Sequence, residues 1–316
     1  MDSYLGDYSY ASFDIETTGL NPKYSKIILA GLFFYDANKN AFISRQILAE
    51  NQSEEKELLL ELKRQLDEFD YVLTFNGRHF DMHFIIERYK KYKILFRPPL
   101  YDLDIYLVLN GYSDLKAKLP NLRQKTVERF LGIDSGRDDK INGKESIILY
   151  NEYEATGDPV LEKVIALHNS DDICQLYQLQ EVLVHADMHK AFTKLGFPVT
   201  SPTFGPLQIN SIKLAGSNIE VSGLQYAHEA QDYIKYSDME NGISLAMDSA
   251  TREFRLSIPV VRKYGGAYVE LVNVGLSDSD VAHLPGYVNG YLVVENKNKI
   301  SHIDLNNAIK KVLESF

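Results

Sequence analysis

The chain has 316 residues, which exceeds one ordinary domain and predicts two domains, each with a hydrophobic core. Hydrophobic residues make up 45% and charged residues 25%, a composition that is typical of globular proteins and excludes a wholly disordered chain. No apolar run reaches the roughly 18 residues of a membrane span, and the N-terminus lacks the basic and apolar regions of a signal peptide. We therefore expect a cytoplasmic protein with no membrane contact.

The net charge of -10 argues against a surface that attracts nucleic acid everywhere. The stretch from Arg88 to Arg129 is nevertheless basic, and aromatic residues are interleaved with its lysines and arginines. Such a stretch is typical of a nucleic-acid groove and also of a solvated helix face. The single cysteine, Cys174, which we expect to serve packing, excludes an intramolecular disulfide and a multi-cysteine zinc site. Any metal must therefore be held by oxygen or histidine.

The first part of the chain is predicted to combine strands and helices. The expected elements are a strand ending at 12–16, a hairpin formed by 26–35 and 41–49, a helix at 55–69, a strand at 71–75 and a helix at 79–92. Three antiparallel strands, a helix, a fourth strand and another helix are the order of a ribonuclease-H-like α/β layer, in which helices flank a mixed sheet. The predicted fold class is therefore α/β.

The pattern changes toward the C-terminus. Residues 159–189 have helical spacing, with a break expected near 168–171, and residues 196–206, with three prolines and two glycines, are typical of a linker. Alternating short runs then predict a mostly β unit, closed by a helix that Asp304 could cap. We therefore expect a domain at residues 1–192 and a smaller β-rich accessory domain at residues 205–316, whose role the sequence does not indicate.

Asp14 and Glu16 lie inside the first predicted strand. Because side chains alternate along a strand, both acids point to one face while Phe13 and Ile15 point to the other. Two carboxylates this close repel and raise each other's pKa unless a cation lies between them. The face is therefore either simply hydrated or a metal site, and the first reading is the better one for an isolated pair.

Further acids occur where elements begin or end. Asp81 follows a strand and the flexible pair Asn76-Gly77, although an acid in the first turn of a helix also favours the helix dipole. Asp172 follows His168 by four residues, so the two share one helix face. Asp14, Glu16, Asp81 and Asp172 could then surround a metal, with His168 nearby as a base. Asp171 competes with Asp172 by adjacency, and Asp102 fits a further site acid or a turn acid equally well.

Three short motifs carry a family resemblance. FDIETTGL at 13–20 resembles the first motif of the DnaQ-like, or DEDD, 3′–5′ exonucleases, NGRHFD at 76–81 resembles the second, and HNSDDI at 168–173 resembles the third. LPNLRQKTVERFLGI and the charged loop after it resemble the YprB-like ribonuclease-H-like domains more specifically. The resemblance covers roughly residues 8–185. D-x-E alone is a weak signal, whereas three ordered motifs at this spacing are a strong one.

The resemblance implies a metal-dependent nuclease that cleaves DNA or RNA, 3′ to 5′ from a single-stranded end. It implies that Asp14, Glu16, Asp81 and Asp172 bind two Mg²⁺ or Mn²⁺ ions and that His168 takes a proton from the attacking water. It also implies that Thr17 contacts the nucleic-acid backbone and that Leu20 is an apolar wedge between bases. Asn76 is a candidate substrate contact and equally a turn residue.

The sequence departs from the family pattern at two positions. One branch has histidine five residues before the last aspartate and the other has tyrosine four before it, whereas His168 lies four before Asp172. His83 replaces a proline that often follows the second motif. Two other functions share these residues: an endonuclease that acts on structured junctions, and a nucleic-acid-binding module without catalysis.

The remaining candidates have structural interpretations. We expect four histidines to be structural or solvated: His79, His83, His185 and His189. Aromatic residues in β-runs are usually core, although five tyrosines of the β-rich part could stack on bases: Tyr226, Tyr233, Tyr236, Tyr264 and Tyr268.

Overall fold

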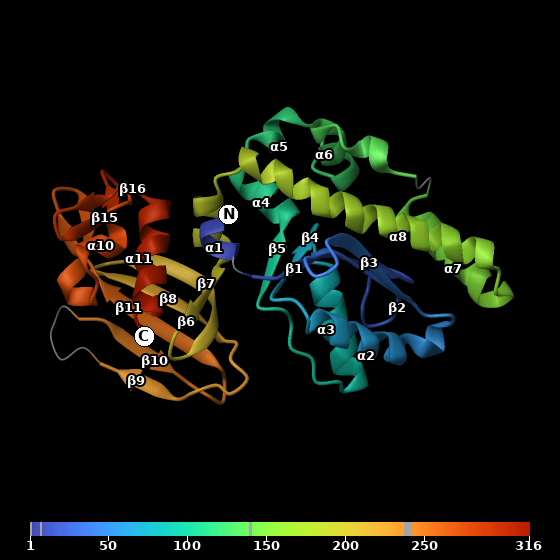
Figure 1. Cartoon of the computed structure of the whole chain (residues 1–316), viewed down its shortest axis with the longest axis horizontal. Coiled ribbons are helices and arrows are strands. Elements are labelled where there is room, and N and C mark those ends of the chain that lie inside the picture. The colour runs from blue at the N-terminus through green and yellow to red at the C-terminus, as the bar shows by residue number, and fades with distance from the viewer. Residues whose placement is uncertain (1, 7, 139–140, 237–241) are drawn as a thin grey trace. The chain divides into compact units, whose positions relative to one another are not determined.

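The structure is a computed structural model, and it describes residues 2–6, 8–138, 141–236 and 242–316 (Figure 1). No helix in these ranges is both long and apolar enough to cross a bilayer.

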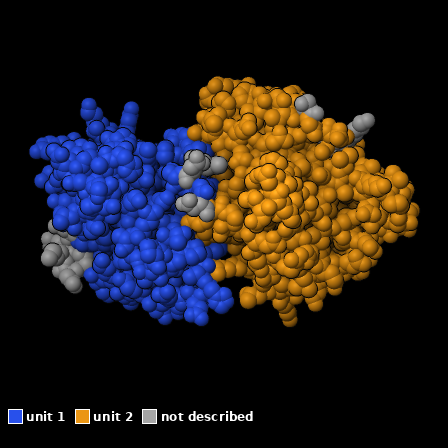
Figure 2. Space-filling model, in the orientation of Figure 1, with its two compact units in different colours: residues 1–6, 187–316 blue, residues 7–186 orange. Residues whose placement is uncertain are grey.

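The chain divides into two compact units, which Figure 2 shows in different colours. We call residues 7–186 the α/β unit, and residues 1–6 together with 187–316 the β-rich unit. This division differs from the expected boundaries, because the first six residues and those from 187 onward group with the β-rich unit.

A five-stranded mixed sheet forms the middle of the α/β unit, with the order β3-β2-β1-β4-β5. The strands β1, β2 and β3 pair antiparallel, whereas β1 with β4 and β4 with β5 pair parallel. The strands are β1 (Tyr10–Thr17), β2 (Ile27–Asp36), β3 (Ala41–Leu48), β4 (Tyr71–Thr74) and β5 (Tyr101–Asp104). The predicted fold class is confirmed.

Helices cover both faces of this sheet (Figure 1). Phe13 and Ile15 of β1 are buried in one core with residues of α2 (Glu55–Leu66) and α3 (Asp81–Tyr92). On the opposite face, the Ser12 hydroxyl donates to the Ile173 carbonyl of α8 (Pro159–Leu179) at 2.7 Å. Alternate residues of β1 therefore face different helices, so the even-numbered residues Asp14 and Glu16 point toward α8.

Helix α8 runs without a break through residues 168–171, where an interruption was expected. That prediction was wrong because His168, Asn169 and Asp171 break the apolar pattern without breaking the backbone. These polar side chains are buried and have partners, so the helix accommodates them. Helix α7 (Gly143–Thr156) packs beside α8.

Residues 93–158 contribute elements that no pattern predicted beyond the basic stretch and the charged loop. Besides β5 and α7, they are α4 (Ile105–Tyr112), α5 (Leu115–Lys118), α6 (Gln124–Leu131) and the 3₁₀ turn η2 (Asp134–Gly136). Two more 3₁₀ turns of the α/β unit are η1 (Gln52–Glu54) and η3 (Gln180–His185).

The β-rich unit contains two antiparallel sheets. The first has the order β6-β7-β8-β11-β10-β9, and the second has β12-β13-β15-β14 with β16 paired to β15. The strands of the first are β6 (Phe197–Ser201), β7 (Gly205–Ala215), β8 (Asn218–Gln225), β9 (Tyr233–Lys235), β10 (Ser244–Met247) and β11 (Glu253–Pro259). Those of the second are β12 (Val261–Lys263), β13 (Gly266–Glu270), β14 (Tyr287–Val288), β15 (Tyr291–Asn296) and β16 (Lys299–Ile300).

The helical segments of this unit are α1 (Asp2–Leu5), α9 (Met188–Leu195), η4 (Leu271–Val274), α10 (Asp278–Val281) and α11 (His302–Glu314). The unit corrects two further predictions. The expected linker at 196–206 contains β6 and the start of β7, which pair in a hairpin. Asp304 does not cap the last helix, because α11 begins at His302 and Asp304 lies inside its first turn. The Asp304 carboxylate accepts hydrogen bonds from the Ser301 hydroxyl and the Gly286 backbone N–H instead.

Candidate active site

A pocket of about 890 Å³ lies within the α/β unit, at the face of β1 that points toward α8. Asp14, Glu16 and Thr17 of β1 line it together with His168 and Asp172 of α8. Residues from α6 and from the start of α7 also line it, as do Leu20 and Phe80. The structure thus brings together side chains that lie more than 150 residues apart in the sequence.

Asp14 is held by a buried amide. The Asn169 Nδ2 donates to Asp14 Oδ2 at 3.0 Å, and Asn169 is fully buried. Gln46 Nε2 donates to Asn169 Oδ1 at 2.9 Å, so the amide oxygen faces Gln46 and the amide nitrogen faces Asp14. Gly31 pairs with Asp14 across β1 and β2, and a Cβ there would lie 2.1 Å from Asn169 Oδ1. The glycine therefore makes room for the amide.

Glu16, His168 and Asp172 form a compact group. His168 Nε2 lies 3.4 Å from Glu16 Oε1 and 3.7 Å from Asp172 Oδ2. One ligand atom from each residue lies within 4.8 Å of the other two, which is close enough for all three to hold one cation. His168 thus has the position of a metal ligand as well as that of the predicted base.

Asp172 also bonds to a residue that sequence reasoning missed. Arg137 Nη2 lies 2.6 Å from Asp172 Oδ1, and the same guanidinium forms an ion pair with the fully buried Glu128. Asp171 is turned away from this group, because its Oδ2 accepts a hydrogen bond from the Asp138 N–H at 2.7 Å. Asp172 lines the pocket and Asp171 does not.

Asp81 lies beside the site but does not line the pocket. It is 3% exposed at the start of α3, and its Oδ1 accepts a hydrogen bond from the Ile15 N–H at 3.1 Å. Asp102 does not line the pocket either: its Oδ1 accepts from the Thr74 hydroxyl at 2.7 Å, and its Oδ2 is buried without a described partner. The structure thus does not bring Asp102 into the pocket.

Burial disfavours charge on each of these acids. Burial is the main reason that the Glu16 pKa rises to about 7 and the Asp81 pKa to about 8. The Asp14 pKa lies well above its ordinary value because of burial and because Asp81, Asp172 and Glu16 carry like charge nearby. Burial also raises the Asp172 pKa, although Arg137 and His168 oppose that shift. Divalent cations would relieve this repulsion, so the donor set fits a metal site bound through oxygen and imidazole.

Part of the pocket wall is basic. Arg123 and Lys125 come from the start of α6, and Lys144 comes from the first turn of α7. Arg88, at the start of the basic stretch, is instead fully buried in an ion pair with Glu55. The aromatic residues of the stretch do not line the pocket, and Tyr89 stacks on Phe96 with 4.1 Å between ring centroids. Part of the basic stretch thus lines the pocket, and part stabilises the core.

The three predicted substrate contacts have different positions. Leu20 lines the pocket and is 84% exposed, which suits a side chain that would insert between bases. Thr17 also lines it, although its hydroxyl donates to the Gly19 carbonyl at 2.8 Å. Asn76 does not line the pocket and has a φ of 66°, as its interpretation as a turn residue expects.

The residues expected to be structural have mixed positions. His79 and His83 are exposed, and His189 Nδ1 is hydrogen-bonded to the Tyr4 hydroxyl at 2.7 Å. Tyr236 and Tyr264 are 75% and 96% exposed, so the expectation that the tyrosines of the β-rich part are core is wrong for these two.

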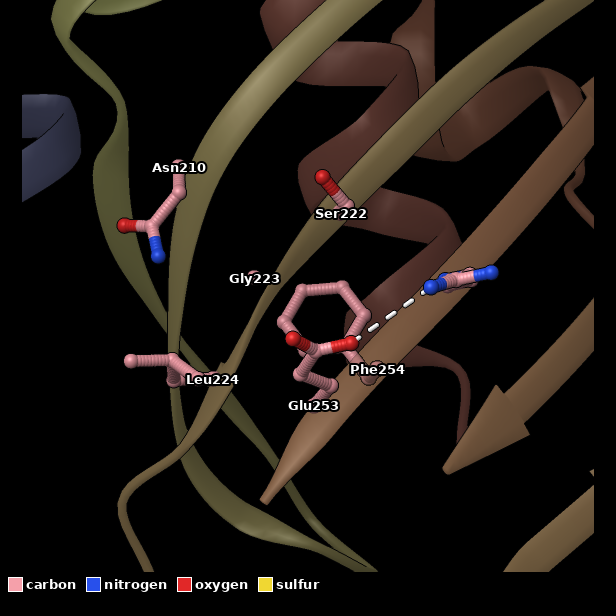
Figure 3. Close-up of a pocket in the computed structure, with 7 residues that line it drawn as sticks. Asn210, Ser222, Gly223, Leu224, Glu253 and Phe254 are labelled. Atoms are coloured by element: carbon pink, nitrogen blue, oxygen red, sulfur yellow. Dashed lines mark ion pairs between the residues drawn. The ribbon is translucent and has the colours of Figure 1, made fainter. Parts of the chain in front are cut away.

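A smaller hollow of about 230 Å³ lies on the first sheet of the β-rich unit. Figure 3 shows Asn210, Ser222 and Glu253 around Gly223 and the Phe254 ring. Glu253 pairs with Arg255 at 3.5 Å, and both side chains are more than half exposed. The hollow therefore lacks the buried acids of the pocket in the α/β unit.

Two comparisons match more than half of the chain. The family model described as RNase_H superfamily matches residues 11–184, more than half of the chain. The uncharacterized protein MJ0365 of Methanocaldococcus jannaschii is 32% identical over 179 residues, which are 55% of this chain and 94% of that protein. The family model therefore covers the unit that contains the acidic pocket.

Among solved structures, similar ones are a family B DNA polymerase from the archaeon Pyrobaculum calidifontis and E. coli exonuclease I in complex with an oligonucleotide. The TM-scores are 0.47 and 0.31, at 12% and 11% identity, over 78% and 68% of this chain. This chain covers 39% of the polymerase chain and 54% of the exonuclease chain, so the likenesses do not extend to whole proteins. Because the family model covers more than half of its residues, the chain belongs to the RNase H superfamily.

Proposed function

We propose that this protein is a metal-dependent 3′–5′ exonuclease of the DEDD type, nearest to the YprB-like domains, that degrades single-stranded ends of DNA or RNA with two Mg²⁺ or Mn²⁺ ions. The observation that carries the proposal is a pocket that is lined both by carboxylates and by cationic side chains. Phosphodiester cleavage needs both, because the acids hold metal and the cations bind the phosphate chain. Membership of the RNase H superfamily supports the same reading.

The acids have distinct roles in this proposal. Glu16 and Asp172, together with Asp14, present carboxylate oxygens at the pocket surface, and Asp81 completes the acidic set from beneath β1. Divalent cations held there supply Lewis-acid activation of water and neutralise charge on the scissile phosphate. His168 accepts the proton of the attacking water, because its imidazole lies in the pocket beside Glu16 and Asp172 and can act as a general base.

The remaining pocket residues bind the substrate. Arg123, Lys125 and Lys144 attract the phosphates of a single strand, and Leu20 separates the terminal bases. Thr17 contacts the backbone of the last nucleotides. Asn76 has no position in this pocket, so the proposal assigns it no contact.

The test uses the full chain with single-stranded DNA and RNA, each labelled in turn at its 5′ and 3′ ends, in Mn²⁺. We expect stepwise shortening from the 3′ end, and we expect Asp14→Asn to abolish it while remaining folded. Release of nucleotides from the 5′ end would contradict the polarity. A folded protein that cleaves neither substrate would refute the proposal and leave a binding module as the alternative.

Branched substrates separate the remaining alternative. A structure-specific endonuclease cleaves a junction internally and leaves a linear single strand intact, whereas the proposed exonuclease shortens both from a free 3′ end. Calcium provides a second control, because its flexible coordination should allow binding without cleavage. Equal turnover in Ca²⁺ and Mn²⁺ would contradict a strict two-ion geometry.

A further inference from the structure

The segment that follows α6 contacts the candidate metal ligand Asp172. Arg137 lies directly after the 3₁₀ turn η2, and its side chain is 7% exposed. Its Nε lies 2.5 Å from Glu128 Oε2, and its Nη2 lies 2.6 Å from Glu128 Oε1. The same Nη2 lies 2.6 Å from Asp172 Oδ1, so one guanidinium bridges two carboxylates.

Glu128 anchors this bridge from α6. Its side chain is fully buried, and the two-point contact with Arg137 fixes the plane of the guanidinium. The contact with Asp172 therefore has two effects: the positive charge of Arg137 favours the ionised carboxylate, and the fixed guanidinium holds Asp172 Oδ1 in place.

Neighbouring contacts fix the segment on α8. The Asp138 N–H donates to Asp171 Oδ2 at 2.7 Å, and Gln124 Nε2 donates to the Asp172 carbonyl at 3.1 Å. The two adjacent acids therefore have different roles. Asp171 fixes the segment through the Asp138 N–H, whereas Asp172 is itself fixed by Arg137 of that segment. With Oδ1 bound to Arg137, the oxygen that faces His168 is Asp172 Oδ2.

We propose that Arg137 is a positioning residue that, fixed by Glu128, restricts Asp172 to binding a divalent cation through Oδ2 alone. This inference rests on the proposed function for the identity of the site, and it adds a residue that none of the three motifs contains. Partners of this kind commonly change metal affinity by about 10-fold to 100-fold when they are removed.

The experiment measures Mn²⁺ binding to the metal-free full chain by calorimetry, next to kcat and KM on an end-labelled single strand. Arg137→Lys keeps the charge but loses the fork, so we expect the Kd for Mn²⁺ to rise about 10-fold and kcat to fall, with an unchanged KM for the strand. Arg129→Lys is the matched control, since Arg129 is 72% exposed and lies 3.7 Å from Asp134. The control should leave Kd, kcat and KM unchanged.

Two further variants separate positioning from folding. In an Asp172→Asn background, Arg137→Lys should cause no additional change in the Kd for Mn²⁺, because Arg137 affects metal binding through its contact with Asp172. Glu128→Gln loosens the anchor and should raise the Kd in the same direction if Arg137→Lys fails to fold. An unchanged Kd in the folded Arg137→Lys or Glu128→Gln protein would overturn the inference. A wild-type protein that binds Mn²⁺ without cleaving would refute the exonuclease and leave this calorimetric test intact.

Discussion

The two units of the chain differ in how deeply their charged side chains are buried. In the α/β unit, Asp81, Glu128 and Arg88 are each at most 3% exposed, and Glu16 is 7% exposed. In the described part of the β-rich unit, ion pairs such as Arg255–Glu253 and Arg262–Glu295 lie at the surface. The buried polar groups there are mainly neutral, as in the hydrogen bonds among Tyr4, Thr193 and Asn306.

This difference indicates where chemistry is located. Burying a carboxylate costs free energy unless a cation or hydrogen bonds compensate for it. Glu55 and Glu128 have arginine partners, which explains their burial by structure alone. Among the described residues, the side chain that donates to the Asp14 carboxylate is the neutral amide of Asn169, and like charges surround this carboxylate. The proposed binding of divalent cations would compensate for this burial.

The largest effect is expected at Asp14. Asp14→Asn removes a metal ligand and should reduce cleavage of single strands on the order of 10³-fold, without loss of folding, because a repelled charge disappears. Glu253→Gln, at the hollow of the β-rich unit, is the matched control and should leave the rate unchanged. The check is the initial rate of release from an end-labelled strand, together with the Tm of each variant. If both variants lose cleavage activity equally, the activity does not depend specifically on the buried acids of the α/β unit.

The metal-free protein should lose stability as the pH rises. The Glu16 pKa is about 7 in the folded protein against an ordinary 4.5, so the folded state retains a proton that the unfolded chain has released. The stabilisation is complete below about pH 4.5 and is lost as the pH rises through about 7, and this amounts to about 3 kcal/mol for this one acid. Thermal unfolding in a metal chelator between pH 4.5 and 8 measures it.

One variant and one added ion test this pH prediction further. Glu16→Gln should flatten the pH dependence, since the amide does not titrate. Saturating Mg²⁺ should also reduce the loss of stability, because a bound cation favours the charged carboxylate. If the metal-free wild type is equally stable at pH 4.5 and pH 8, the pKa of Glu16 is not raised in the folded protein.

A smaller effect is expected from adding one methyl group at Gly31, which pairs with Asp14 across β1 and β2. A Cβ at Gly31 would lie 2.1 Å from Asn169 Oδ1, so Gly31→Ala should lower the free energy of unfolding by about 1–3 kcal/mol and displace the amide. Gly111→Ala is the control, because a Cβ there meets no described atom within 4 Å and Gly111 lies in α4. That control should be neutral or slightly stabilising. Urea unfolding of the two variants compares them directly.

The smallest effect is expected at the basic wall. Lys125→Gln and Lys144→Gln should each weaken the binding of a single strand and reduce the slope of log K against log salt concentration by about 1. Lys235→Gln changes a lysine of the β-rich sheet and should leave the slope unchanged. Fluorescence anisotropy in Ca²⁺ at several salt concentrations provides the slopes. If Lys235 changes the slope and the pocket lysines do not, the strand binds to the other unit.

The sequence contained enough to predict the first strand and its acids. Period-two alternation fixes the faces of Asp14 and Glu16, and the i,i+4 spacing places His168 beside Asp172. Asn169 had a weak signal, since it follows His168 within the third motif. Its bond to Asp14 depends on Gln46 and Gly31 of neighbouring strands, which no local pattern relates to it.

The rest depends on long-range packing. Arg137 lies in a charged loop that the sequence did single out, but its contact with Asp172 exists only because η2 folds back onto α8. The break expected in α8 was wrong because polar residues there are buried at the site. Asp304 was mistaken for a cap because its carboxylate bonds to Gly286, which is 18 residues away. Contacts of this kind follow from the tertiary fold and not from local spacing.

The central claim is that the buried acids of the α/β unit bind divalent cations. Calorimetry of Mn²⁺ binding to the metal-free chain at pH 7, in two buffers of different ionisation enthalpy, tests it most directly. Because the Glu16 pKa is about 7 and the Asp81 pKa about 8, binding should release protons, and Asp14→Asn should weaken it strongly. Absence of Mn²⁺ binding to the folded wild type, or equal binding to Asp14→Asn, would contradict the claim.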